Sequence, residues 1–260
     1  MGIGKYVAAA ALTALTIGSV KAADLAQTPL ADYSTVSTMN DRIGMGGEIS
    51  FSFEDSEYFD DQHYLFDAGI SILYENNIIV QMQAEYSNYT DLDYPVTEID
   101  FLLGYRLSEQ ISVAALLQYE NFDDTEYWNA GFDSKISTDR FDIEWGGTVY
   151  LTEDGETYDG GQTTLIGTFH LNENFDAIAT GSFVDDDGDI YKTLGAGIRW
   201  TNSAPEGSPL DGVFVEGMGY IGTEDGVGDY SVGKVTIGKE FGSGIYFKKK
   251  GWFAAVPSHY

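Results

Sequence analysis

The chain has 260 residues, no cysteine and a formal charge of −29 at pH 7, with 42 Asp and Glu against 13 Lys and Arg. The absence of cysteine excludes disulfide frameworks, thiol catalysis and cysteine metal sites. Nucleic acid is excluded as a partner because its phosphates would be repelled by the acidic chain. The content of 18 Tyr, 15 Phe and 4 Trp is far too high for a disordered acidic coil.

The N-terminal segment 1–22 is interpreted as an export signal, with Lys5 before an apolar run at 6–17 and small residues ending at Ala22. Its removal would make the charge more negative, because it holds two lysines and no acidic residue. Residues 23–41 are polar, and we expect a periplasmic lead-in or a partial plug. Past the signal no apolar stretch reaches the roughly 18 residues of a transmembrane helix, which leaves a soluble β protein or a β-barrel.

From Ile43 onward, apolar residues recur at every second position, which is the period of a strand with two different faces. Each alternating segment is about 9 to 12 residues long, the length that a tilted strand needs to cross a bilayer. There are twelve such candidates, whose alternating apolar positions fall within 43–53, 64–74, 78–86, 99–105, 111–119, 128–132, 141–151, 165–171, 175–183, 190–200, 213–221 and 235–241. An even number of strands returns the start and the end of the chain to the same side of a membrane.

The connections between these segments alternate as well. After the even-numbered segments come short polar turns, at 75–77, 107–110, 137–139 and 172–174, and a longer link with two prolines at 202–211. After the odd-numbered segments come acidic links, at 54–61, 91–93, 120–126, 153–159, 185–189 and 224–229, which hold 22 of the 42 acidic residues and no Lys or Arg. This sorting favours a membrane barrel, with short turns in the periplasm and longer loops outside.

Residues 42–241 resemble the porin-like outer-membrane barrels of Gram-negative bacteria. Aromatic residues near the strand ends fit their interfacial girdles, and the segment Val235–Phe241 is similar to their barrel-ending strand with a terminal aromatic residue. The resemblance implies an all-β fold, a transmembrane antiparallel up-and-down barrel of about 12 strands in the cell outer membrane. Its partners would be outer-membrane lipid and lipopolysaccharide, small solutes or cations, and in a homo-oligomer further copies of the chain.

Two features depart from this family's pattern. Lys239 falls on the apolar register of the last strand, and a tail at 242–260 follows where such barrels usually end. We interpret this tail, which carries Lys248, Lys249 and Lys250, as a periplasmic extension. The alternative is that residues 245–253 join the sheet and change the strand count.

The inward positions of the predicted strands are rich in acidic residues. A lone buried ion costs several kcal/mol, so this many carboxylates require water in the lumen. Twelve strands lie between barrels of about eight strands, which side chains fill, and barrels of sixteen or more, which leave a wide channel. The predicted pore-lining residues are Glu48, Asp67, Glu85, Glu98, Asp100, Arg106, Glu120, Asp133, Lys135, Arg140, Asp142, Glu144, Asp176, Arg199 and Glu216.

These residues predict a channel for passive diffusion of small solutes, preferring cations because acidic residues raise the local cation concentration. One alternative is a non-conducting surface barrel for adhesion or membrane integrity, with residues such as Leu65, Leu116 and Phe214 filling the lumen. A barrel hydrolase using His63 at the outer rim is a further alternative. No serine motif surrounds that histidine, and no enzyme activity, metal site or other cofactor is expected.

Overall fold

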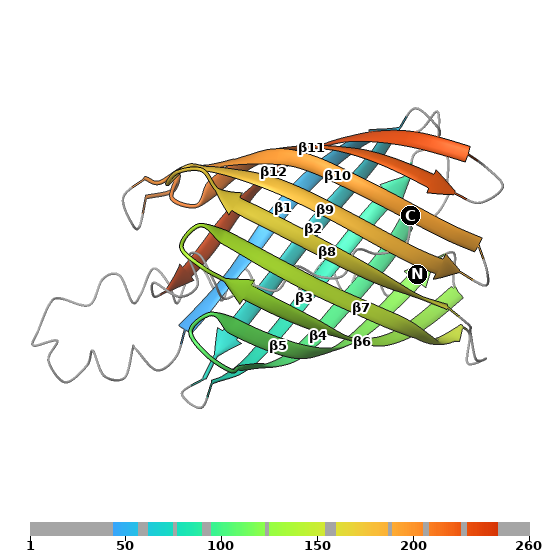
Figure 1. The fold of residues 1–260 in the computed structure, drawn as a ribbon, viewed down its shortest axis with the longest axis horizontal. Coiled ribbons are helices and arrows are strands. Elements are labelled where there is room, and N and C mark those ends of the chain that lie inside the picture. The colour runs from blue at the N-terminus through green and yellow to red at the C-terminus, as the bar shows by residue number, and fades with distance from the viewer. Residues whose placement is uncertain are drawn as a thin grey trace, which may run out of the picture.

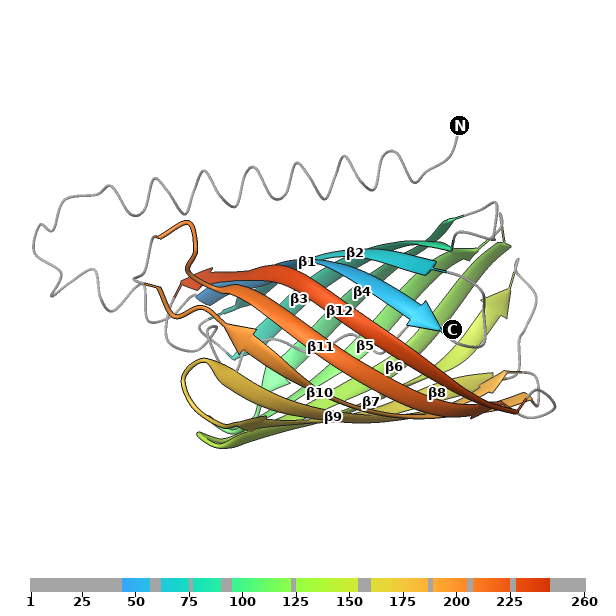
Figure 2. The same ribbon diagram turned by 90° about the horizontal axis from the view of Figure 1, so that it is seen from above.

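The computed structural model describes residues 44–56, 62–74, 77–89, 95–122, 125–153, 160–186, 189–204, 208–224 and 228–243. The elements are β1 (Gly44–Ser56), β2 (Gln62–Leu73), β3 (Ile78–Tyr89), β4 (Pro95–Arg106), β5 (Ile111–Phe122), β6 (Thr125–Ser137), β7 (Phe141–Glu153), β8 (Gly160–His170), β9 (Phe175–Asp186), β10 (Asp189–Thr201), β11 (Val213–Glu224) and β12 (Gly228–Ser243). Each strand pairs antiparallel with the next, and β12 pairs with β1, which closes the barrel (Figures 1 and 2). The predicted twelve-stranded barrel is confirmed.

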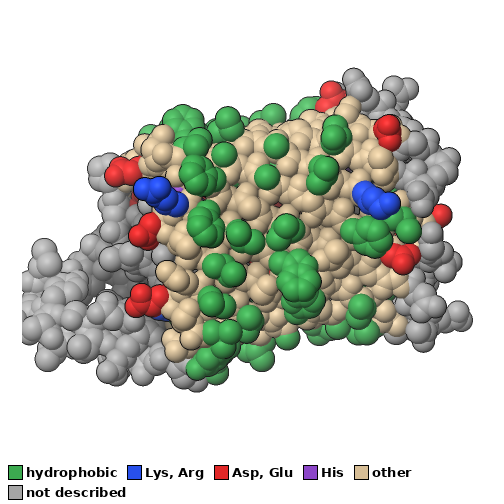
Figure 3. Space-filling model, in the orientation of Figure 1, with side chains coloured by type: hydrophobic (Ala, Val, Ile, Leu, Met, Phe, Trp, Pro, Cys, Tyr) green, Lys and Arg blue, Asp and Glu red, His purple; other side chains and the backbone are tan. Residues whose placement is uncertain are grey.

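The two faces of the sheet have opposite character, as the alternation predicts. Outward side chains such as Leu103, Leu194 and Ile221 are more than 60% exposed, whereas inward side chains such as Gln81 and Gln118 are at most 1% exposed. Figure 3 shows hydrophobic side chains spread over the middle of the wall and charged side chains near its two ends. An outer surface of this kind is stable where apolar lipid surrounds it. Among the described residues, no helix is long and apolar enough to cross a membrane.

Short turns gather at one end of the barrel, which we name the turn end. There Asn77 adopts a left-handed φ of 64° between β2 and β3, a conformation that asparagine tolerates well. Between β8 and β9 the Asn172 side chain accepts hydrogen bonds from the backbone of Asn174 and Phe175. Gly44 and Ser243 lie at the same end, because β1 and β12 pair there. The opposite end, toward which the acidic links lead, is the loop end.

Strand β12 continues to Ser243, two residues beyond the predicted end of the barrel at 241. Lys239 has the outward parity that its place in the sequence predicts, and its Nζ donates to the backbone oxygen of Pro209 at 2.9 Å. The ammonium group of Lys239 therefore lies at the turn end, and its aliphatic chain lies along the outer wall. The predicted export signal at 1–22, the lead-in at 23–41 and the tail from 244 onward lie outside the described residues.

A charge placed at the middle of the outer face should destabilise the barrel. Leu165 lies midway along β8 and is 53% exposed, so we expect Leu165→Arg to lower the free energy of unfolding by about 2 to 4 kcal/mol in lipid. Thr223, on the outer face near the loop end of β11, is the matched control, and Thr223→Arg should cost about 0 to 1 kcal/mol. Urea unfolding in vesicles measures both. Equal costs at the two positions would contradict a lipid-facing wall.

Candidate functional site: the barrel lumen

The predicted lining residues, with the exception of Arg140, lie on strands at positions of inward parity. Arg140 is exposed in the turn between β6 and β7. The backbone N–H and the hydroxyl of Thr138 both hydrogen-bond the carbonyl of Phe141, so β7 begins only at Phe141. Arg140 therefore directly precedes β7, where its backbone oxygen accepts a hydrogen bond from the N–H of His170 at 2.8 Å. Its place in the pore lining stays a prediction.

Four acidic residues stand directly opposite one another on four neighbouring strands. The register pairs Asp67 of β2 with Glu85 of β3, Glu85 with Glu98 of β4, and Glu98 with Glu120 of β5. We name these four residues the carboxylate row. Side chains directly opposite in a sheet are about 5 Å apart at Cβ, and like charges there are destabilising. The row therefore carries an energetic cost that the fold by itself does not require.

The position next to the row, toward the turn end, is occupied by amides and one further acid. Gln83, Asp100 and Gln118 are paired in register across β3, β4 and β5. The Gln83 amide donates to Asp67 at 2.7 Å, and the Asn129 amide of β6 donates to Gln118 at 2.8 Å. These bonds hold the side chains against the wall without adding a positive charge.

Several polar atoms of this region are buried without a hydrogen-bond partner. They are Oε2 of Glu98, Oδ1 of Asp100, Oε2 of Glu120 and Nε2 of Gln118, in side chains at most 4% exposed. An unsatisfied buried polar group costs free energy, and far more when it is charged. Water or a cation near these four side chains would therefore lower the cost of burying them. Within the described parts of the chain, no group of three or more acidic or histidine side chains is arranged to hold a metal ion.

The opposite side of the lumen has a different character, because its acids are paired with a base. Arg199 of β10 contacts Glu216 at 2.9 Å, Glu240 at 2.8 Å and Glu48 at 3.5 Å. Its guanidinium also lies 4.0 Å from the centre of the Phe214 ring, a cation–π contact. One arginine thus joins β1, β10, β11 and β12, on both sides of the closing pair of strands.

A second ionic group lies toward the loop end, and the sequence interpretation missed it. Lys234 of β12 contacts Glu54 of β1 at 2.9 Å, and His63 of β2 contacts the same carboxylate at 3.1 Å. Glu54 had been assigned to the acidic link after the first strand, although its parity continues the inward series of Glu48. The signal was available in that alternation. His63 is 6% exposed within this group, which does not suit a residue that must reach an outside substrate.

Further ionic contacts lie near the turn end. His170 of β8 lies 2.7 Å from Asp176 and 3.5 Å from Asp142, and Lys135 lies 3.4 Å from Glu144. The Arg106 Nε donates to the backbone oxygen of Ser108 in the β4–β5 turn at 3.3 Å. The predicted lining residues are thus divided between paired groups and the acid-rich wall of β2–β5.

A group of apolar side chains also faces the lumen, between the carboxylate row and the turn end of β2–β5. Ile79, Leu102, Ala114 and Leu116 are at most 7% exposed and pack together, with Leu73 against them. We name these five residues the inner apolar patch. Their low exposure shows that this part of the inner wall is packed and not lined by water.

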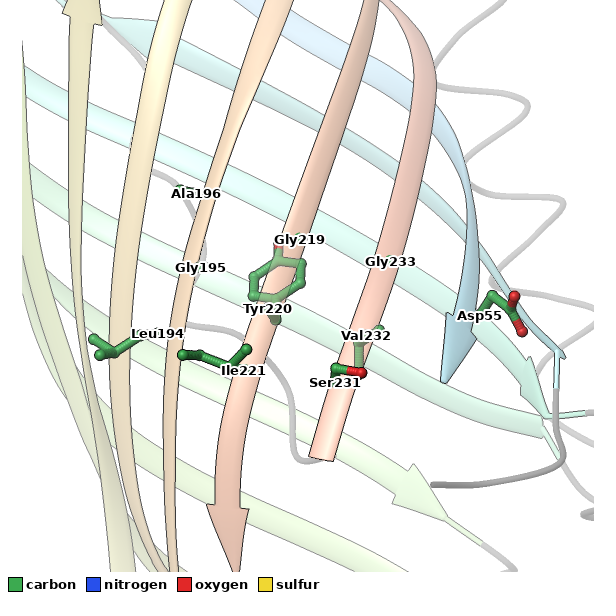
Figure 4. A pocket seen from close by; sticks show the side chains of 10 residues that line it. All are labelled: Asp55, Leu194, Gly195, Ala196, Gly219, Tyr220, Ile221, Ser231, Val232 and Gly233. Atoms are coloured by element: carbon green, nitrogen blue, oxygen red, sulfur yellow. The ribbon is translucent and has the colours of Figure 1, made fainter. Parts of the chain in front are cut away.

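A hollow in the wall on the other side of the barrel shares no residue with the carboxylate row. Figure 4 shows it at β10, β11 and β12, with Leu194, Tyr220 and Ile221 around it and Asp55 at its edge. A Cβ added to Gly219 or Gly233 would meet no atom within 4 Å, so the hollow exists because these positions carry no side chain.

The Arg199 group should contribute to the stability of the barrel. Arg199→Gln would leave three carboxylates facing one another, and we expect a loss of about 3 kcal/mol in the free energy of unfolding. This is the lower end of the range for a buried ion pair, because the Glu240 side chain is 34% exposed. Lys192→Gln, on the outer face of the same strand, is the control and should be nearly neutral.

Denaturant unfolding of both variants gives the comparison. Adding Glu216→Gln and Glu240→Gln to Arg199→Gln should restore most of the loss, since it removes the unpaired charges. No recovery in this triple variant would show that Arg199 acts through its packing on Phe214 and not through its charge.

Residues 22–177 match the model of a protein family described as "Putative outer membrane beta-barrel porin, MtrB/PioB". Similar solved structures include the KdgM porin, at a TM-score of 0.52 and 11% identity over 75% of this chain and 99% of that one. The NanC porin aligns at a TM-score of 0.51 and 9% identity over 76% and 98% of the two chains. A KdgM porin in complex with disordered oligogalacturonate aligns at 0.51 and 10% identity over 75% and 99%. At these identities the likeness shows a shared barrel fold. No curated protein matches the sequence.

Proposed function

Because the chain belongs to the MtrB/PioB family of outer-membrane β-barrel porins, we propose that it conducts small solutes by passive diffusion and prefers cations. Its place is the outer membrane, as for the porins whose fold it shares. The carboxylate row is the observation that carries the cation preference. Its four acids follow one another across β2–β5, with Asp100 beside them.

The charge on the two sides of the lumen supports this preference. Arg199 and Lys234 are held by carboxylates on β1, β11 and β12, so their positive charge is largely compensated where it stands. Glu98 and Asp100 of β4 and Glu120 of β5 each keep a buried carboxylate oxygen without a hydrogen-bond partner, so we expect their potential to extend into the lumen. A narrow space of low dielectric with acids on one wall concentrates cations and repels anions.

This charge pattern separates the proposed substrate class from that of one structural relative. The KdgM porin has been seen with oligogalacturonate, an acidic oligosaccharide. We expect an acidic lumen to exclude such a chain and to admit small cations or neutral solutes. Outer-membrane lipid and lipopolysaccharide would surround the wall, and association of several barrels would leave the lumen of each unchanged.

Ion selectivity in planar bilayers tests the proposal. Under a KCl gradient the reversal potential should indicate a preference for K⁺, and Glu98→Gln with Glu120→Gln should shift it toward zero, because half of the carboxylate row is neutralised. Glu173→Gln, which removes an exposed acid in the β8–β9 turn, should leave it unchanged. A chloride preference in the unaltered protein, or equal shifts in both variants, would refute the assignment to the row.

Solute uptake by vesicles provides a second test. Vesicles containing the protein should swell faster in a small amine salt than in an acidic sugar of similar size, with neutral sugars between them. High salt should reduce the difference, because it screens the row. Faster entry of the acidic sugar at low salt would contradict an acidic selectivity region.

A second candidate, a non-conducting barrel for adhesion or membrane integrity, is favoured by one observation. Inward side chains of β3–β7 are closely packed, with Leu116 at 4% and Asn129 at 0% exposure, and the inner apolar patch lies among them. This candidate predicts no conductance steps from the unaltered protein in a bilayer. A barrel hydrolase is not proposed, because His63 is engaged with Glu54.

A further inference from the structure

The outer wall over β10, β11, β12 and β1 carries two opposite charges that the barrel itself does not pair. Lys192 of β10 and Asp55 of β1 are both exposed on the outer face, toward the loop end of their strands. Within the strands that the structure describes, neither side chain forms an ion pair. A charge on a lipid-facing wall costs free energy unless it reaches water, a head group or an opposite charge.

The two charges lie at the same depth in the membrane, although they are three strands apart. A line of directly opposed outward residues starts at Asp55 and ends at Ile111, the first residue of β5 at the turn end, by way of Gly233, Gly219, Ala196, Ala179, Gly167, Ile143 and Ile136. The line falls from the loop end to the turn end because barrel strands are tilted and staggered. Over the three steps from β1 to β10 it falls by about four residues. The residue of β10 at the depth of Asp55 therefore lies four positions from Ala196 toward the loop end, and this residue is Lys192.

Between these two charges the outer wall has a projection beside a recess. Ile221 of β11 is 65% exposed and stands directly opposite Ser231 of β12. Gly219 and Gly233 form the next outward pair, and a Cβ added to either would meet no atom within 4 Å. Figure 4 shows the hollow that these small residues leave, with Ile221 on one side and Asp55 at its edge.

These features are complementary to themselves under a two-fold rotation. Two copies inserted in the same direction can be related by an axis along the membrane normal, which places each residue against the one at equal depth on the other side of the axis. With the axis between β11 and β12, Lys192 of each copy faces Asp55 of the other. Ile221 of each copy faces the recess at Ser231 and Gly233 of the other.

The shape of the wall allows this approach. Two barrels curve away from each other on both sides of a contact line, so their backbones must come close at the line itself. Gly219 and Gly233 permit this, because small residues let two backbones approach closely in a membrane. The long side chain of Lys192 then spans the wider gap to Asp55 of the second copy.

We propose that two copies of this chain associate through the outer faces of β10, β11, β12 and β1, with the two-fold axis between β11 and β12. Each Lys192–Asp55 pair replaces two lipid-facing charges by an ion pair, and each Ile221 side chain fills the recess of the other copy. The partner is a second copy because one surface supplies both charges and both shapes. The association does not depend on the proposed conduction, since each lumen stays separate.

Charge reversal tests the pairing in the full-length protein in lipid vesicles. Asp55→Lys or Lys192→Glu alone should lower the association constant by about tenfold or more, because like charges then face each other. The two changes together should restore it, since the pair is formed again with its charges exchanged. Asn88→Lys, exposed near the loop end of β3, is the matched control and should leave association unchanged.

Single-molecule photobleaching over a dilution series measures the dimer fraction of each variant. A protein that is monomeric at every dilution would overturn the proposal, and so would a double variant as weak as the single ones.

Cysteine cross-linking tests the position of the axis, because the chain contains no cysteine of its own. Ser231 lies beside the proposed axis, so mild oxidation of Ser231→Cys should give a covalent dimer. Asn88→Cys, also on the outer face but on a distant part of the wall, should stay monomeric. Equal yields at the two positions would indicate random collision and would contradict the proposed interface.

A lipid phosphate is the other group that Lys192 could meet at this depth. In that case Lys192→Glu would reduce the retention of anionic lipid, Asp55→Lys would not, and Ser231→Cys would give no covalent dimer. This outcome overturns the proposal. A failed dimer leaves the porin function untouched, and a barrel that does not conduct leaves the cross-link to decide whether two copies meet.

Discussion

Backbone hydrogen bonding in a medium without water is the constraint on which this structure depends. In lipid every N–H and C=O of a spanning segment needs a partner within the protein, and a sheet meets this requirement only when it has no free edge. Here the last strand supplies that partner to the first, along β1 from Met45 to Ser56. The even strand number, the shared end of β1 and β12 and the enclosed lumen all follow from this closure.

Successive side chains of a strand point to opposite faces of the sheet, so in a closed barrel they alternate between the outer environment and the lumen. The outer face meets lipid and carries exposed apolar side chains such as Leu194 and Ile221. The inner face is then free to carry charge, and it does so unevenly. Arg199 joins three acids beside the closing strands, while β2–β5 place four acids directly opposite one another.

The two groups of inward acids therefore differ in what they contribute to the protein. The acids around Arg199 are compensated and hold strands together. The carboxylate row opposes folding, because its acids stand directly opposite one another on neighbouring strands. Under the proposed function, water and permeating cations in the lumen would offset this cost.

The alternation of apolar and polar residues determined the strands and their number, and the sorting of acidic links against short turns predicted which connections share an end of the barrel. These are local properties, because strand parity and turn composition can be read within a few residues. Lys239 lies on the outer face as its parity predicts, and only the structure showed that its ammonium donates a hydrogen bond to the backbone oxygen of Pro209. That Glu54 belongs to a strand and Arg140 to a turn depended on where pairing starts and stops. The tertiary structure alone decided that Asp67, Glu85, Glu98 and Glu120 stand in one row, because the register between strands is set by turn geometry and barrel closure.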